Sequence, residues 1–157
     1  MKKLIAALLT LLLLAGVAAC QSPAAGSNAA VQGSLEEIMA KIYAGAKVEM
    51  PELVNTEITG ENSKYYLGVE NMEFNEALAS EPLMNASPHS VCLVRLNDDQ
   101  DVEAVKKQIK ENVDPFKWVC VGVQEDEIVV DNIGDLVVLI MSADADALHE
   151  SFLTLKN

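Results

Sequence analysis

The chain is poor in the side chains on which most enzymes and nucleic-acid-binding proteins depend. Its 157 residues include two histidines, one arginine and seven aromatic side chains, and 11 basic residues stand against 24 acidic ones. A formal net charge of −13 repels nucleic acid and anionic lipid headgroups alike. Neither is therefore an expected partner of the folded surface.

The sequence also lacks the short motifs of common catalytic and nucleotide-binding sites. It contains no Gly-x-Ser-x-Gly, no Gly-x-Gly-x-x-Gly and no phosphate-binding loop of the Gly-x-x-x-x-Gly-Lys type. His149-Glu150 begins like the helix of a zinc protease, but Leu153 stands where the second histidine is required. We therefore expect no catalytic constellation, no cofactor and no zinc site of this kind.

Carboxylates gather in two places that could suggest calcium binding. An EF-hand loop requires glycine at its sixth position and glutamate at its twelfth, and neither cluster has them. Asp, Asn and Ser also cap helix amides, so both clusters are better interpreted as helix starts, and we expect no metal. The clusters are Asp98, Asp99 and Asp101, and Asp144, Asp146 and Glu150.

The longest apolar run lies at the beginning of the chain. Lys2 and Lys3 precede the run 4–15, which only Thr10 interrupts, and small residues follow. This order is typical of a secretory signal. An uncleaved membrane helix is the alternative, but the 16 residues from Leu4 to Ala19 fall short of the roughly 20 that cross a bilayer. Residues 1–19 are therefore predicted to be a signal peptide.

Val17-Ala18-Ala19-Cys20 resembles the lipobox of bacterial lipoproteins. By this resemblance Cys20 carries a diacylglycerol and becomes the first mature residue, and two acyl chains anchor a protein stably. Residues 21–33 are uncharged and rich in Ala, Ser, Gly and Asn, so residues 20–33 are predicted to be a flexible tether with a reach of roughly 20 Å. The membrane is thus an expected partner only through the lipid on Cys20.

Residues 34–157 are predicted to form one acidic α+β domain with a largely antiparallel sheet and helices packed against it. Without Lys2 and Lys3, nine basic side chains oppose the 24 acidic ones, a formal charge of −15. A capping box at Ser34 starts the first helix, and Gly68 ends the second. Periodicity predicts helices over 35–46, 60–67, 102–113 and 144–155. Residues 47–58 are predicted to be irregular or to contain a short strand. An edge strand is predicted over 73–84, a central strand over 91–96, and further strands over 118–123, 128–131 and 136–141, of which the last two are joined by a hairpin.

The stretch from Leu35 to Leu155 resembles a family of small lipoproteins of unknown function, mostly from clostridia-like Gram-positive bacteria. None of the motifs behind this resemblance is catalytic. The resemblance implies location and architecture, and it supplies no functional residues. The motifs are Glu49-Met50-Pro51, Tyr65-Tyr66-Leu67-Gly68, Glu81-Pro82-Leu83-Met84, the stretch from Asp101 to Lys106, and the strand from Gly134 to Met141.

Cys92 and Cys120 both lie in predicted strands. Free cysteine is among the most buried residue types, so we interpret both as reduced core thiols that activity does not need. An exported protein could instead join them in a disulfide. The remaining alternative is a nucleophile formed by one of them with His89.

Tyr65 and Tyr66 are the candidate partner-binding residues. Successive helix side chains diverge by about 100°, so both rings cannot point into one core and at least one is expected at the surface. Exposed tyrosine is enriched at interaction sites because it offers a large apolar area with a polar tip. We expect the segment 82–88 to form the rim of this patch.

These observations favour a non-enzymatic protein, lipid-anchored on the extracytoplasmic face of the cell membrane, whose domain binds an unknown envelope protein or small ligand. Two alternatives stay open. One is a secreted hydrolase that depends on a thiol or on carboxylates. The other is a structural accessory of an exporter or envelope complex. The absence of a nucleophile–base motif weighs against the hydrolase.

Overall fold

The computed structural model describes residues 30–84 and 87–156. The predicted signal peptide, Cys20 and residues 20–29 of the tether lie outside the described residues. No helix in the described part of the chain combines the length and the hydrophobicity needed to cross a membrane.

A five-stranded antiparallel sheet forms the middle layer of the domain, which confirms the predicted α+β class. The strands lie in the order β1-β2-β3-β5-β4. In the sheet β3 lies between β2 and β5, as predicted from its apolar character on both faces. The strands are β1 (Leu53–Glu57), β2 (Glu76–Pro82), β3 (His89–Arg95), β4 (Ile128–Ile133) and β5 (Leu136–Ser142).

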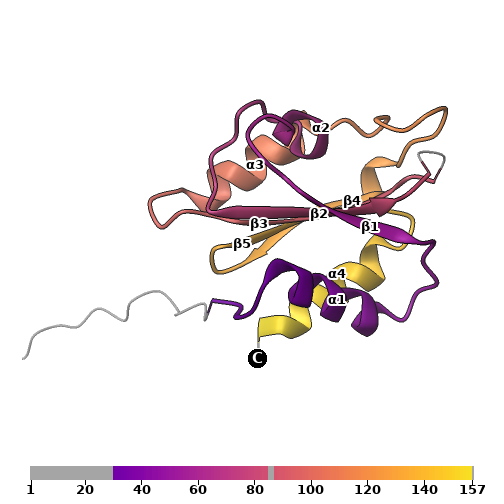
Figure 1. Ribbon diagram of the computed structural model, residues 1–157, viewed down its shortest axis with the longest axis horizontal. Helices are drawn as coiled ribbons and strands as arrows, with labels where there is room; N and C mark the ends of the chain where they lie inside the picture. The colour runs from indigo at the N-terminus through magenta and orange to yellow at the C-terminus, as the bar shows by residue number, and fades with distance from the viewer. Residues whose placement is uncertain (1–29, 85–86, 157) are drawn as a thin grey trace, which may run out of the picture.

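Helices cover both faces of this sheet, so the core has two halves (Figure 1). The helices are α1 (Leu35–Ala46), α2 (Ser63–Leu67), α3 (Val102–Asn112) and α4 (Ala145–Leu153), with short 3-10 turns η1 (Glu125–Glu127) and η2 (Thr154–Lys156). α1 and α4 pack on one face against side chains such as Leu93 and Ile140. α2 and α3 lie over the other face, where Cys92 and Leu139 are buried.

Local capping signals set several boundaries where they were predicted. The Ser34 hydroxyl accepts a hydrogen bond from the Glu37 amide, and the Glu37 carboxylate accepts one from the Ser34 amide. The Asp101 carboxylate accepts from the first amides of α3. Gly68 ends α2 at φ 76°, where its missing Cβ leaves room for the backbone of Asn112.

Two predicted strands need correction. β2 is not an edge strand, because β1 pairs along its outer side and Leu53 faces Pro82 at the end of β2. The segment 118–123 is not a strand but part of a loop, closed by a hydrogen bond from the Val123 amide to the Pro115 carbonyl at 3.0 Å. Trp118 and Val123 reach the core from this loop. The apolar side chains of the segment therefore have the spacing of a strand, although its backbone pairs with no other strand.

Residues 31–33, which the sequence assigns to the flexible tether, belong to the folded domain instead. Val31 is buried in the half of the core that α1 and α4 cover. Arg95 at the end of β3 donates to the carbonyl oxygens of Val31 and Gly33, at 3.0 and 3.1 Å. The arginine also pairs with Glu76 at 2.7 Å, so it fixes the incoming chain to the sheet.

The two ends of β3 define two poles of the molecule, about 20 Å apart for a strand of this length. At the Arg95 end the chain enters the domain. At the His89 end lie the connection between β2 and β3 and the loop 113–124. Figure 1 shows these at opposite sides of the view, with the indigo start of the described chain at the left and the loops at the right.

Candidate functional site

A buried lysine organises the His89 end of the sheet. The side chain of Lys117 is only 3% exposed, and its ammonium lies 2.6 Å from a carboxylate oxygen of Glu81. It also donates to the hydroxyl of Ser90 at 3.2 Å. A buried ammonium is tolerated only when it is paired and hydrogen-bonded, and here both conditions hold. The contacts attach the loop 113–124 to the ends of β2 and β3.

Three aromatic rings surround the same ammonium. It lies 4.9 Å from the ring centroid of Tyr65 and 5.3 Å from those of Tyr66 and Trp118. Cations are attracted to the faces of such rings within about 6 Å. The two tyrosine rings meet edge to face, 4.9 Å apart. Lys117 therefore joins α2, the loop and β2 in one cluster.

The two tyrosines differ in exposure, as their adjacency on a helix predicts. Tyr65 is exposed, whereas Tyr66 is half-buried against the core. Burial raises the pKa of Tyr66, partly offset by a hydrogen bond with Thr56 of β1. Tyr65 is thus the ring that a partner could reach, and Tyr66 supports it from below.

All six large apolar side chains that are exposed among the described residues lie around Lys117 and Glu81. Val54 is the register partner of Glu81, and two others follow Glu81 closely in the chain. Two more flank Lys117, and the sixth is Tyr65. We name these residues the loop pole: Val54, Tyr65, Leu83, Met84, Phe116 and Val119, with exposed fractions between 41% and 76%.

A groove of about 370 Å³ opens at one side of the loop pole. Pro51, Pro82, Leu83 and Met84 supply most of its lining, with Glu52 and Ser87 as its polar members. Glu81, the residue before the predicted rim segment 82–88, contacts Lys117, which in turn lies over Tyr65 of α2. Residues 82–84, 87 and 88 of that segment are described, and its role as a rim stays a prediction. Exposed apolar side chains gathered at one place mark an interaction surface more often than scattered ones do.

No family model, curated protein or solved structure matches this chain. The resemblance to the lipoprotein family of unknown function therefore stays a prediction.

The predicted thiol sites are placed quite differently from one another. Cys92 and Cys120 are both free, as predicted, but only Cys92 is buried. Cys120 is exposed in the loop with φ 61°, so its expected place in a core strand is wrong. Burial raises the pKa of Cys92 to about 11 despite the nearby charge of Lys117, which keeps this thiol protonated and unreactive.

His89 cannot serve as a base for Cys92, because the two side chains lie on opposite faces of the sheet. Cys92 belongs to the half of the core under α2 and α3. His89 faces α1, where its Nε2 lies 2.9 Å from the Tyr43 hydroxyl and its Nδ1 lies 3.0 Å from the Ser142 hydroxyl. Burial lowers the pKa of His89 to about 4, so the ring is neutral at neutral pH. Its contacts attach α1 to β3 and β5.

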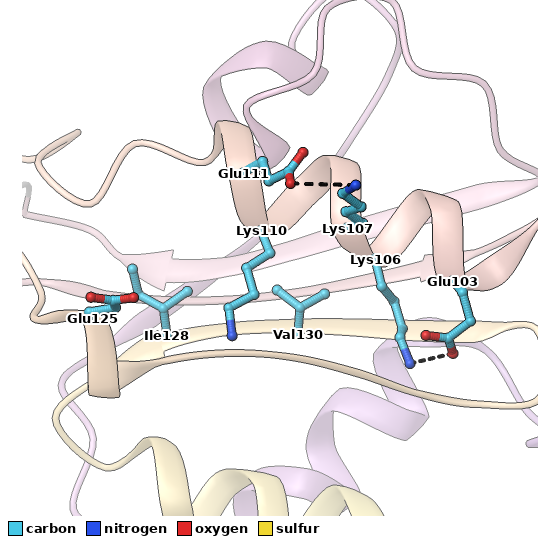
Figure 2. A pocket seen from close by; sticks show the side chains of 8 residues that line it. All are labelled: Glu103, Lys106, Lys107, Lys110, Glu111, Glu125, Ile128 and Val130. Carbon is cyan, nitrogen blue, oxygen red and sulfur yellow. Dashed lines mark hydrogen bonds and ion pairs between the residues drawn. The ribbon is translucent and has the colours of Figure 1, made fainter.

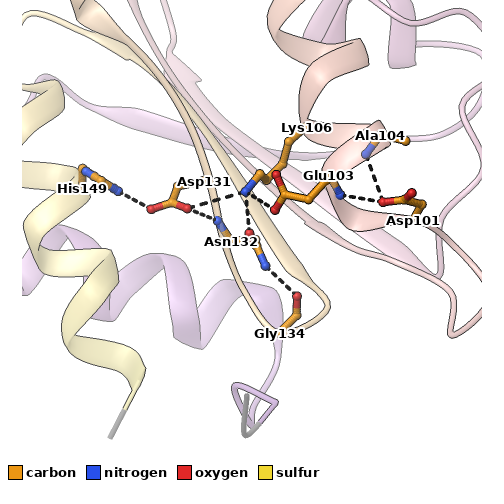
Figure 3. Close-up of polar contacts among 8 residues, drawn as sticks. All are labelled: Asp101, Glu103, Ala104, Lys106, Asp131, Asn132, Gly134 and His149. Atoms are coloured by element: carbon orange, nitrogen blue, oxygen red, sulfur yellow. Dashed lines mark hydrogen bonds and ion pairs between the residues drawn. The ribbon is translucent and has the colours of Figure 1, made fainter. Parts of the chain in front are cut away.

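A second polar network crosses the open edge of the sheet (Figure 3). Asp131 on β4 accepts from His149 of α4 at 2.7 Å and lies 4.0 Å from Lys106 of α3. Burial alone would raise the pKa of Asp131, but hydrogen bonds from His149 and the Asn132 amide, with the Lys106 charge, bring it below its usual value. Asp131 therefore connects the two helix layers across the outermost strand.

The acidic clusters have local structural roles or lie in solvent. Figure 3 shows the Asp101 carboxylate on the first amides of α3. Asp144 occupies the N-cap position of α4 without a side-chain bond to its amides, and the Ser142 hydroxyl accepts from the Asp144 amide. Within residues 30–84 and 87–156, no three His, Cys, Asp or Glu side chains are grouped closely enough to hold a metal ion.

Proposed function

We propose that the chain is a lipoprotein held through Cys20 on the extracytoplasmic face of the cell membrane, and that its domain is a non-enzymatic binding module. The observation that carries the proposal is the position of the loop pole, at the end of the sheet opposite to the entry of the chain. A domain tethered at its Arg95 end presents this pole away from its anchor. The expected partner is another envelope protein, bound through Tyr65 and the neighbouring apolar side chains.

The non-enzymatic part of the proposal rests on the placement of the nucleophile candidates. Cys92 is buried and protonated, and His89 faces the other side of the sheet. Cys120 is accessible, yet no histidine contacts it among the described residues. These contacts support a binding role and weigh against the alternative of a thiol hydrolase.

Site-specific photo-crosslinking in intact cells tests the proposal. A benzophenone side chain introduced at Phe116 or Met84 should give one discrete protein adduct. The same group at Glu150, which is exposed on α4 away from the loop pole, is the matched control and should give none. Equal labelling from all three positions, or no adduct from the loop pole, would contradict the proposal.

A further inference from the structure

The outer edge of β4 carries a groove that contains no residue of the loop pole. It has a volume of about 560 Å³ and lies between α3 and β4 (Figure 2). Ile128 and Val130 of β4 form an apolar floor, and Lys106, Lys107 and Lys110 of α3 extend along one side. This places three of the nine basic residues that follow the predicted signal peptide beside a single apolar strip.

Backbone pairing shows which groups of β4 are open to solvent. Gly134 and Asp135 form a two-residue turn with φ 60° at Gly134, and Ile133 pairs with Leu136 directly beside it. In such a hairpin Ile133 is hydrogen-bonded to its opposite residue, and the pairs then alternate along the ladder. The amide and carbonyl of Ile128, Val130 and Asn132 therefore point outward.

Two of these outward amides already have a partner. The Ile128 amide donates to the Glu125 carbonyl at the end of η1, and the Asn132 amide donates to the Asp131 carboxylate at 2.8 Å. Val130 differs from both, because neither its amide nor its carbonyl makes a hydrogen bond with the described residues. The outward amides at both ends of β4 are thus occupied, and Val130 is the described outward position of this strand whose amide is available to a further strand.

Three lysines and three glutamates line the groove, and two ion pairs join four of them. Lys106 contacts Glu103 at 2.6 Å and Lys107 contacts Glu111 at 3.8 Å, whereas Lys110 on the helix side and Glu125 at the end of the strip are in no ion pair among the described residues. Figure 2 shows the Lys110 side chain extending from α3 to β4, between Ile128 and Val130. A cation without a partner therefore stands over an apolar floor and an unpaired backbone position.

We propose that this groove binds a short extended peptide segment that carries a carboxylate. Its main chain pairs with Val130, as in the addition of a strand to a sheet edge. Apolar side chains of the segment lie on Ile128 and Val130, and its carboxylate contacts Lys110. A second copy of the chain fits less well, because a two-fold contact about Val130 would set the lysines of both copies side by side.

The test uses the full chain in detergent and a fluorescent, acetylated and amidated peptide, Thr-Val-Thr-Glu-Thr-Val-Thr. Its Val and Glu side chains share one face of the strand. Fluorescence anisotropy should show saturable binding, and amide hydrogen exchange should slow at Val130 when peptide is bound. Peptides with Gln or Lys at the central position should bind about fivefold more weakly or worse.

Variants of the groove separate its two contacts. Lys110→Gln should weaken the Glu peptide about fivefold and leave the Gln peptide unchanged, while Lys64→Gln on α2 serves as the control. Val130→Pro should weaken every peptide about tenfold, because it removes the outward amide but no bond to β5, and Val130→Ala keeps that amide. Circular dichroism confirms that each variant is folded.

Three outcomes would overturn the inference. They are no saturable binding, equal binding of the Glu and Lys peptides with no effect of Lys110→Gln, and a sedimentation dimer that Val130→Pro dissociates. The last outcome would assign the edge to a second copy. None of them bears on the loop pole, which lies elsewhere and is tested by crosslinking.

Discussion

Lys117 shows how one residue can hold an irregular segment in place. The loop 113–124 contains neither a helix nor a strand, so no ladder of backbone hydrogen bonds holds it. The contacts of the Lys117 ammonium with Glu81 and Ser90 hold it in place instead. Removing one partner of a buried ion pair leaves the other uncompensated, whereas replacing both by apolar groups is often nearly neutral. The cluster is therefore a sensitive point for stability.

We predict that Lys117→Ala lowers the free energy of unfolding by about 3 kcal/mol, because it leaves the largely buried Glu81 carboxylate without its cation. The double variant Lys117→Met with Glu81→Leu should lose much less. Urea denaturation of Lys117→Ala, of the double variant and of its two single substitutions, Lys117→Met and Glu81→Leu, measures the differences. If the double variant lost as much as the sum of its single substitutions, Lys117 and Glu81 would not be energetically coupled.

His89 makes stability depend on pH. Its pKa is about 4 in the folded chain, against an ordinary value near 6.5, so between these values the unfolded chain binds more protons. The His89 contribution is complete above pH 6.5 and decreases as the pH falls towards 4, by up to about 3 kcal/mol. Urea denaturation at several pH values should show this slope, and His89→Gln should flatten it. Asp131 acts in the same direction, so an unchanged slope in His89→Gln would assign the effect to other groups.

At the scale of the elements, α2 presents one tyrosine and buries the other. Tyr65→Ala should cost less than about 1 kcal/mol of stability, because its ring is exposed, and should strongly reduce crosslinking from Phe116. Tyr66→Ala should cost about 3 kcal/mol by opening a cavity. Thermal unfolding and adduct yield measure both variants. A large stability loss with undiminished crosslinking in Tyr65→Ala would remove this residue from the interface.

Elements were predictable wherever a signal is local. The capping box at Ser34, the carboxylate at Asp101 and the left-handed glycine at position 68 act within one turn of helix, so their boundaries follow from adjacent residues. The position of β2 inside the sheet could not be predicted in this way. It depends on pairing with β1, and the order of elements along the chain does not determine that pairing. The segment 118–123 failed because apolar side chains that reach a core from a loop have the spacing of a strand.

Those parts of the candidate site that depend on adjacent residues were predictable, and those that depend on distant residues were not. The exposure of one tyrosine follows from helix geometry alone. The role of Lys117 depends on Glu81 and Ser90, which belong to other strands, and a single lysine before a tryptophan carries no local sign of burial. Cys120 was misplaced together with its strand, whereas Cys92 was placed correctly because both faces of β3 are apolar.

At the scale of the whole molecule, the two poles have opposite characters. Arg95 fixes the entering chain with main-chain and carboxylate contacts that no apolar side chain could supply. The loop pole collects the exposed apolar side chains of the described residues. This arrangement has a functional meaning only if the chain is anchored on the N-terminal side of residue 30. The proposed function therefore depends on the lipid at Cys20.

We predict that the wild-type chain partitions into the detergent phase and incorporates radiolabelled palmitate, because two acyl chains hold a protein at a membrane stably. Cys20→Ala should stay in the aqueous phase or persist as an uncleaved precursor, without label. Cys120→Ala is the matched control, since it removes an exposed thiol but leaves the lipobox intact, and it should behave as wild type. Palmitate incorporation that survives Cys20→Ala but is lost in Cys120→Ala would place the lipid on Cys120, the residue after Val119 of the loop pole, and would turn the proposed binding face towards the membrane.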